Sequence, residues 1–119
     1  MWFYSQSTGR LTHYGELIGT GYAGHPPYVN DPLAQDKHGF GPLPQGMYTI
    51  GQEVSSTLGP ITMPLQPYPQ NEMYGRSGFY MHGDNPAHVG WSSDGCIIMP
   101  HDVRNQVSVS TDRVLMVTW

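Results

Sequence analysis

Residues 78–99 read G-F-Y-M-H-G-D-N-P-A-H-V-G-W-S-S-D-G-C-I-I-M, and this stretch decides the fold. Residues 78–83 are aromatic and apolar between two glycines and end in His-Gly, which is typical of a short strand. Residues 84–93 are polar and rich in turn formers, which predicts a loop. Residues 96–99 form a second short apolar segment. The sequence therefore predicts a rigid strand and an apolar segment joined by a loop that returns the chain.

Working outward, turn signals at regular intervals predict further short strands on both sides of this stretch. We expect strands at residues 2–5, 10–14, 16–22, 46–51 and 114–118. Residues 60–68 predict a weaker strand at the edge of the sheet, because Pro64 and Pro67 cannot donate a backbone hydrogen bond. Residues 23–44 are punctuated by glycine and proline and predict a long loop, of the kind that often carries function. A helix is expected over residues 100–107, since proline suits the first helical position.

The composition supports one small, mainly β domain spanning residues 1–119. The 15 glycines and 11 prolines among 119 residues argue against long helices. Aromatic residues reach 12%, whereas disordered chains are poor in aromatics. We expect a sandwich-like β fold with one short helix after Cys96.

Charge and segment patterns exclude several classes of function. The net charge is −4, and the five cationic side chains are scattered rather than gathered in a basic stripe, which argues against nucleic-acid binding. No apolar run is long enough to span a membrane. The first residues have neither a cationic segment nor an apolar region, so we expect synthesis in the cytoplasm without a signal peptide. The single cysteine excludes an internal disulfide framework.

That cysteine, Cys96, is the leading candidate for chemistry. A thiol nucleophile needs a base, usually an imidazole, and acyl transfer also needs donors for the oxyanion. His82, at the end of a strand, would be held rigidly, and Gly95 permits a tight turn that exposes the backbone N–H groups of Gly95 and Cys96. The alternative interpretation is structural, because a lone cysteine is most often a small buried hydrophobe.

The combined motifs resemble a known family. Strand-His-Gly, a loop, and Ser-x-Gly-Cys-Ile are similar to the signature of L,D-transpeptidase catalytic domains of the YkuD-like fold. Residues 41–51, G-P-L-P-Q-G-M-Y-T-I-G, resemble the Pro-x-Gly-x-Tyr-x-Ile strand of that fold. The stretches at residues 4–11, 75–79, 82–84 and 95–99 resemble most closely the type VI secretion L,D-transpeptidase effectors, which are antibacterial toxins that act on peptidoglycan. The resemblance covers nearly the whole chain.

This resemblance implies a role for each matching residue. Cys96 would attack the carbonyl after diaminopimelate in a stem peptide, and His82 would act as the base, with its ring held by a carbonyl in the Gly83 region. Gly95 and Cys96 would form the oxyanion hole, and Ser93 matches the family's Ser/Thr. The implied activity is L,D-carboxypeptidase trimming of tetrapeptides, L,D-transpeptidase exchange of D-amino acids, or both, without a metal or other cofactor. The implied setting is secretion into the periplasm of target bacteria, with a cognate immunity protein and a secretion-machine component as partners.

The chain departs from the family pattern at Asp94, where many transpeptidases carry a histidine. An ionised Asp94 close to Cys96 would oppose formation of the thiolate. The distance of fourteen residues from His82 to Cys96 is short, which suggests a more open active site.

Four residues are weaker candidates for substrate binding. Asp94 is one of them, and Asp84 could orient His82 or bind an amine, although aspartate also favours such turns. Arg76 could clamp a carboxylate bidentately or lie on the surface. Trp91 could line the cleft or cap the core.

Two other function classes stay open at this point. One is a zinc hydrolase that uses His82, Asp84, His88 and Cys96, although no paired ligand spacing supports it. The other is a non-enzymatic wall-binding or phage-tail module in which Cys96 is structural. His88 also competes with His82 as the base, but no strand fixes it. We assign no role to His13, His25, His38 and His101.

Overall fold

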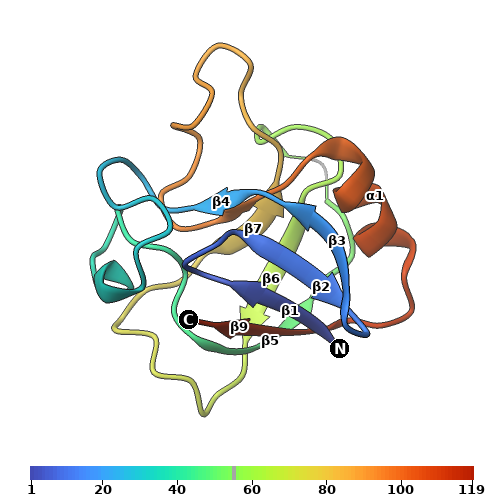
Figure 1. Ribbon diagram of the computed structural model, residues 1–119, viewed down its shortest axis with the longest axis horizontal. Coiled ribbons are helices and arrows are strands. Elements are labelled where there is room, and N and C mark those ends of the chain that lie inside the picture. Colours follow the sequence, from blue (N-terminus) through green and yellow to red (C-terminus); the bar gives the residue numbers. More distant parts are fainter. Residues whose placement is uncertain (55) are drawn as a thin grey trace.

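The computed structural model describes residues 1–54 and 56–119, which form one mixed nine-stranded sheet with a single α-helix among them (Figure 1). The strands are β1 (Trp2–Ser5), β2 (Arg10–His13), β3 (Glu16–Thr20), β4 (Tyr22–Ala23), β5 (Gly46–Ile50), β6 (Met63–Pro67), β7 (Phe79–His82), β8 (Ile97–Ile98) and β9 (Val114–Thr118). A short 3₁₀ turn spans Pro32–Ala34, and α1 spans His101–Val109. The predicted mainly β class, with one short helix after the cysteine, is confirmed.

The strand order β3-β2-β1-β9-β5-β6-β7-β8-β4 produces a nearly closed sheet. Its two edge strands, β3 and β4, are consecutive in the chain, and Gly21 alone separates them. A side chain is excluded at Gly21, because an added Cβ would lie 1.7 Å from the backbone oxygen of Ile98. The strand predicted over residues 16–22 is therefore two strands, which pair with opposite ends of the sheet.

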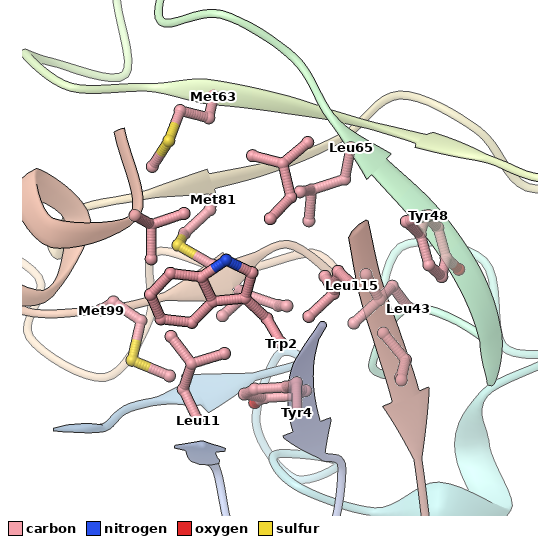
Figure 2. Close-up of a cluster of buried hydrophobic side chains, with 14 of the residues drawn as sticks. Trp2, Tyr4, Leu11, Leu43, Tyr48, Met63, Leu65, Met81, Met99 and Leu115 are labelled. Atoms are coloured by element: carbon pink, nitrogen blue, oxygen red, sulfur yellow. The ribbon is translucent and has the colours of Figure 1, made fainter. Parts of the chain in front are cut away.

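The core lies inside this curved sheet, and side chains from strands far apart in the sheet order converge on it (Figure 2). Trp2 and Tyr4 of β1 meet Met81 of β7 and Leu115 of β9, all of them fully or almost fully buried. Helix α1 contributes Val103 to the same cluster. The core of this sandwich-like fold is therefore enclosed by a single curved sheet rather than by two separate sheets.

The prediction that residues 60–68 form an edge strand is wrong, because β6 lies between β5 and β7. Pro64 pairs with Tyr80 of β7, whereas the β5 ladder stops at the next residue of β6, Leu65. On the β5 side, the Pro64 carbonyl still accepts a hydrogen bond from the N–H of Gly51 at 2.8 Å. Pro67 pairs with β5, at a position beyond the end of the β7 ladder. Each proline belongs to only one ladder, so the missing N–H groups do not prevent β6 from occupying an interior position.

Of the loop predicted over residues 23–44, only Ala23 belongs to a strand, β4, and the remaining residues contain only the 3₁₀ turn. The segment is nevertheless packed against the sheet. Leu43 is fully buried, and its carbonyl accepts a hydrogen bond from the buried amide of Gln6 at 2.9 Å. This anchoring places residues 35–42 beside the loop that precedes Cys96, where they help to form the candidate site.

Candidate functional site

The parallel pairing of β7 with β8 brings His82 and Cys96 close in the fold. Met81 pairs with Ile97 and His82 with Ile98, so Cys96 falls one step earlier, beside Tyr80. Met81 and Ile97 belong to the core. Because side chains alternate along a strand, His82 and Cys96 belong to the opposite face. The two candidate residues are therefore on adjacent chain segments and on the same side of the sheet.

His82 is buried, and a hydrogen bond to the backbone fixes the orientation of its ring. Its side chain is 3% exposed, and Nδ1 donates a hydrogen bond to the carbonyl of Gly83 at 2.9 Å. A donating Nδ1 leaves Nε2 as the unprotonated nitrogen. Burial lowers the pKa of His82, and the charge of Arg104 adds to this, whereas the Gly83 hydrogen bond and Asp84 act in the other direction. The imidazole is therefore neutral at neutral pH.

Cys96 lies beside β7, and its surroundings favour the thiol over the thiolate. Its Sγ accepts a hydrogen bond from the backbone N–H of Tyr80 at 3.4 Å. Burial raises the pKa of the Cys96 thiol, and the nearby charge of Asp94 raises it further, while the Tyr80 hydrogen bond and the charge of Arg76 lower it. No hydrogen bond joins Cys96 to His82 among the described residues. Proton transfer between them therefore requires the thiol to leave the amide of Tyr80.

Two cavities without a common lining residue lie next to these side chains. The larger cavity, about 690 Å³, lies at the carboxyl end of β7. It is bounded by residues 57–60, 82–86, His88, 91–92 and Arg104. The smaller cavity, about 310 Å³, lies at the start of β7 and is bounded by His38, Gly39, residues 75–79, Asp94 and Cys96. The imidazole and the thiol thus face different spaces, which suits a substrate that extends on both sides of a reacting bond.

Ser93 organises the turn that carries the cysteine. Its fully buried hydroxyl donates to the carbonyl of Cys96 at 2.6 Å and accepts from the N–H groups of Gly24 at 2.9 Å and Gly95 at 3.0 Å. The Gly95 amide, one of the two predicted oxyanion donors, is therefore engaged by Ser93 in this structure. Gly95 adopts a φ of +144°, and an added Cβ would lie 2.7 Å from both the Arg76 guanidinium and the Phe79 ring.

Arg76 is a structural residue in this arrangement rather than a free clamp. Its two terminal nitrogens donate to four backbone carbonyls, those of Gln35, Gly41, Pro42 and Asp94, at 2.6–3.1 Å. The guanidinium also lies 5.1 Å from the centre of the Phe79 ring. These bonds leave no pair of terminal N–H groups to hold a substrate carboxylate bidentately. They do fix residues 35–42 against the turn before Cys96.

Asp84 closes the loop over residues 84–92, in keeping with its expected turn role. One oxygen accepts hydrogen bonds from the hydroxyls of Tyr22 at 2.8 Å and Ser92 at 2.7 Å, and the other accepts from the Gly90 N–H at 3.1 Å. These bonds lower the pKa of Asp84 despite its partial burial. Trp91 lines the larger cavity. It does not cap the core, because it is 59% exposed.

Two residues at the site were not identified from the sequence. Arg104 of α1 is buried and lines the larger cavity, and its guanidinium packs so closely on Gly83 that an added Cβ would lie 2.7 Å away. The only signal was its place on the helix that follows Cys96. His38 lines the cysteine cavity, and its Nε2 donates to the carbonyl of Tyr74 at 2.6 Å. It lies on the long loop, where spacing gives no signal.

The geometry does not favour the zinc alternative. Within residues 1–54 and 56–119, no group of three or more His, Cys, Asp or Glu side chains is arranged to hold a metal ion. His82, Asp84 and His88 line the larger cavity, whereas Cys96 faces the smaller one. The four proposed ligands are therefore not brought together.

Comparison with known proteins gives one finding on the family. A family model described as the Tlde1 domain matches residues 18–116, which include every candidate site residue. No curated protein matches the sequence. In the described part of the chain, no helix has the length and apolar character needed to cross a membrane.

Proposed function

Because the chain belongs to the Tlde1 domain family, an L,D-transpeptidase-like family of type VI secretion effectors, we propose that it is an antibacterial enzyme that acts on peptidoglycan stem peptides by cysteine acyl transfer. One observation carries the proposal. The proposal is supported by the β7–β8 register, in which His82 pairs with Ile98 and Cys96 directly precedes Ile97, with a separate cavity beside each of the two side chains.

The first half of the proposed reaction forms a thioester. The Cys96 thiol turns from the Tyr80 amide and gives its proton to Nε2 of His82, and the thiolate attacks the carbonyl carbon of the L,D-bond. The C–N bond then breaks, and protonated His82 delivers the proton to the departing amine of D-alanine. The acyl group stays on Sγ, and the amine leaves on the imidazole side.

The second half releases the acyl group. His82 takes a proton from water, and the hydroxide adds to the thioester, giving a tripeptide and restoring the thiol, which is L,D-carboxypeptidase trimming. A D-amino acid that reacts in place of water gives exchange by the same steps. The larger cavity beside His82 has room for either the departing or the incoming amine.

The developing oxyanion requires backbone donors near Sγ. We assign this role to the N–H groups of Cys96 and Gly95, the latter after release from Ser93. Ser93 would then stabilise the turn in the resting enzyme and yield one donor to the substrate. Gly83 contributes its carbonyl, which fixes the tautomer of His82.

As part of the same proposal, the enzyme acts in the periplasm of target bacteria after delivery by a secretion machine. A producing cell would then need an immunity protein that blocks the cavities at Cys96 and His82. Loss of crosslinking donors from the wall would be the cause of toxicity.

The test combines toxicity with product analysis. Cys96→Ala and His82→Ala are expressed with an export signal beside the parent chain and beside His101→Ala, which alters an exposed histidine on α1. We expect the parent and the His101 variant to be toxic and to convert tetrapeptides to tripeptides or exchanged products in muropeptide mass spectrometry. Full toxicity of either site variant, at equal protein level, would overturn the proposal.

A further inference from the structure

We propose that the smaller cavity binds the side-chain ammonium group of the acyl donor, with the carboxylate of Asp94 as its partner. The inference rests on the proposed function, since it concerns how the same site selects the stem peptide. The third residue of a stem peptide carries an ammonium group on its side chain, a few bonds from the carbonyl that Cys96 would attack, and in diaminopimelate a carboxylate is bonded to the same side-chain carbon. With that carbonyl at Sγ, the side chain reaches the cavity that Cys96 lines.

The unpaired charge in this cavity is negative. Asp94 is exposed, and no hydrogen bond or ion pair among the described residues engages its carboxylate. The other charged residue of the cavity, Arg76, has both terminal nitrogens committed to backbone carbonyls. The Arg76 guanidinium has no free terminal N–H groups to bind an anion, whereas the Asp94 carboxylate is free to bind a cation.

A second acceptor lies on the same cavity wall. His38 donates from Nε2 to the carbonyl of Tyr74 at 2.6 Å, and this tautomer leaves Nδ1 as an acceptor. An ammonium group has three N–H donors and no acceptor. A carboxylate and an imidazole acceptor in one cavity of about 310 Å³ match that donor pattern.

The ammonium would also prepare the nucleophile. The charge of Asp94 contributes to the raised pKa of the Cys96 thiol, after the larger effect of burial. Pairing Asp94 with the substrate ammonium group offsets part of this unfavourable charge, so the thiolate becomes easier to form when the correct donor is bound. This explains how an aspartate next to Gly-Cys can be tolerated at a thiolate site.

The first test uses two matched peptides, L-Ala-D-isoGlu-L-Lys-D-Ala and its Nε-acetyl-lysine analogue. We expect the parent enzyme to favour the free amine by about fivefold in kcat/KM, which is the effect of one partly exposed ion pair. Asp94→Asn should abolish this preference, and Asp94→Glu should retain part of it. Glu16→Gln, which removes an exposed charge on β3, is the control and should leave the preference unchanged. An equal loss on both peptides in Asp94→Asn would overturn the inference.

A second test does not depend on turnover. Cys96 is the only cysteine, so its modification rate can be compared for cationic and anionic methanethiosulfonate reagents of similar size. We expect the ratio of cationic to anionic rates to fall about fivefold in Asp94→Asn and to stay unchanged in Glu16→Gln. An unchanged ratio in Asp94→Asn would overturn the cation site even if the peptides are cleaved. A changed ratio without cleavage of any peptide would support the cation site and overturn the proposed enzyme.

Discussion

Nδ1 of His82 lies 2.9 Å from the carbonyl oxygen of Gly83, its own chain neighbour. The bond requires no distant partner, so the ring orientation is built into the end of β7. Arg104 packs against Gly83, at a position where an added Cβ would lie 2.7 Å from the guanidinium. A neutral, oriented imidazole is thus maintained by the backbone and by a buried cation.

The burial of His82 predicts an acid-dependent loss of stability. The folded-state pKa lies below the ordinary value of 6.5, so above that pH the imidazole is neutral in both states and has no linkage effect. As the pH falls below 6.5, the unfolded chain binds a proton that the folded chain resists, and stability declines. In urea unfolding, the free energy of unfolding should fall less between pH 7.5 and pH 5.0 for His82→Gln than for the parent protein. The control is His101→Gln, which should change the loss of stability between the two pH values less than His82→Gln does. If it reduces that loss as much, burial of His82 is not its cause.

Ser93 should contribute to the stability of the fold. Ser93→Ala removes a hydroxyl that satisfies two N–H groups and one carbonyl around the Cys96 turn, at a fully buried position. We expect a loss of about 2–3 kcal/mol in the free energy of unfolding, since buried unpaired groups are costly. Ser108→Ala, which loses only a 3.4 Å contact with Glu53, is the control and should change stability little. Chemical denaturation measures both, and equal losses would show that the Ser93 network is energetically unimportant.

The sequence predicted the strands that flank the site because their limits are local. Glycines bound residues 78–83, and alternation within the strand places His82 at its end. The interior position of β6 was missed, since it depends on where the neighbouring ladders stop rather than on the prolines themselves. Proline content alone could not reveal that each of the two prolines belongs to only one of the two ladders.

The roles of Arg76 and Asp84 illustrate a second limit of local patterns. The carbonyl partners of Arg76 on the long loop lie 34–41 residues away in the chain, and Tyr22 lies 62 residues from Asp84. Such partners exist only once the sheet has nearly closed. The division between two cavities has the same origin, so the sequence could predict Cys96 and His82 as candidates but not the separate spaces that they face.

Two buried tyrosines provide a matched pair for the energetics of the core. The hydroxyl of Tyr4 is the one buried side-chain polar atom without a partner among the described residues, whereas the hydroxyl of Tyr48 donates to the carbonyl of Pro44 at 2.7 Å. Tyr4→Phe should therefore stabilise the fold by about 1 kcal/mol, and Tyr48→Phe should destabilise it by about the same amount. Thermal and urea unfolding of the two variants give the measurement. Destabilisation by Tyr4→Phe would mean that its hydroxyl has a partner in solution.

Gly95 should tolerate no side chain, for steric reasons that go beyond its backbone angle. Its φ of +144° is one that residues with a Cβ rarely adopt, and the added methyl group would meet Arg76 and Phe79 at 2.7 Å. Gly15 has a φ of +78° with nothing within 4 Å of the added Cβ, so Gly15→Ala isolates the backbone effect at about 1 kcal/mol. We expect Gly95→Ala to cost at least 2 kcal/mol more than that, roughly the scale of overpacking a buried site. Circular dichroism melts compare the two variants. If Gly95→Ala were no less stable than Gly15→Ala, Arg76 and Phe79 would have to move apart enough to accept a Cβ at residue 95, which would contradict this prediction.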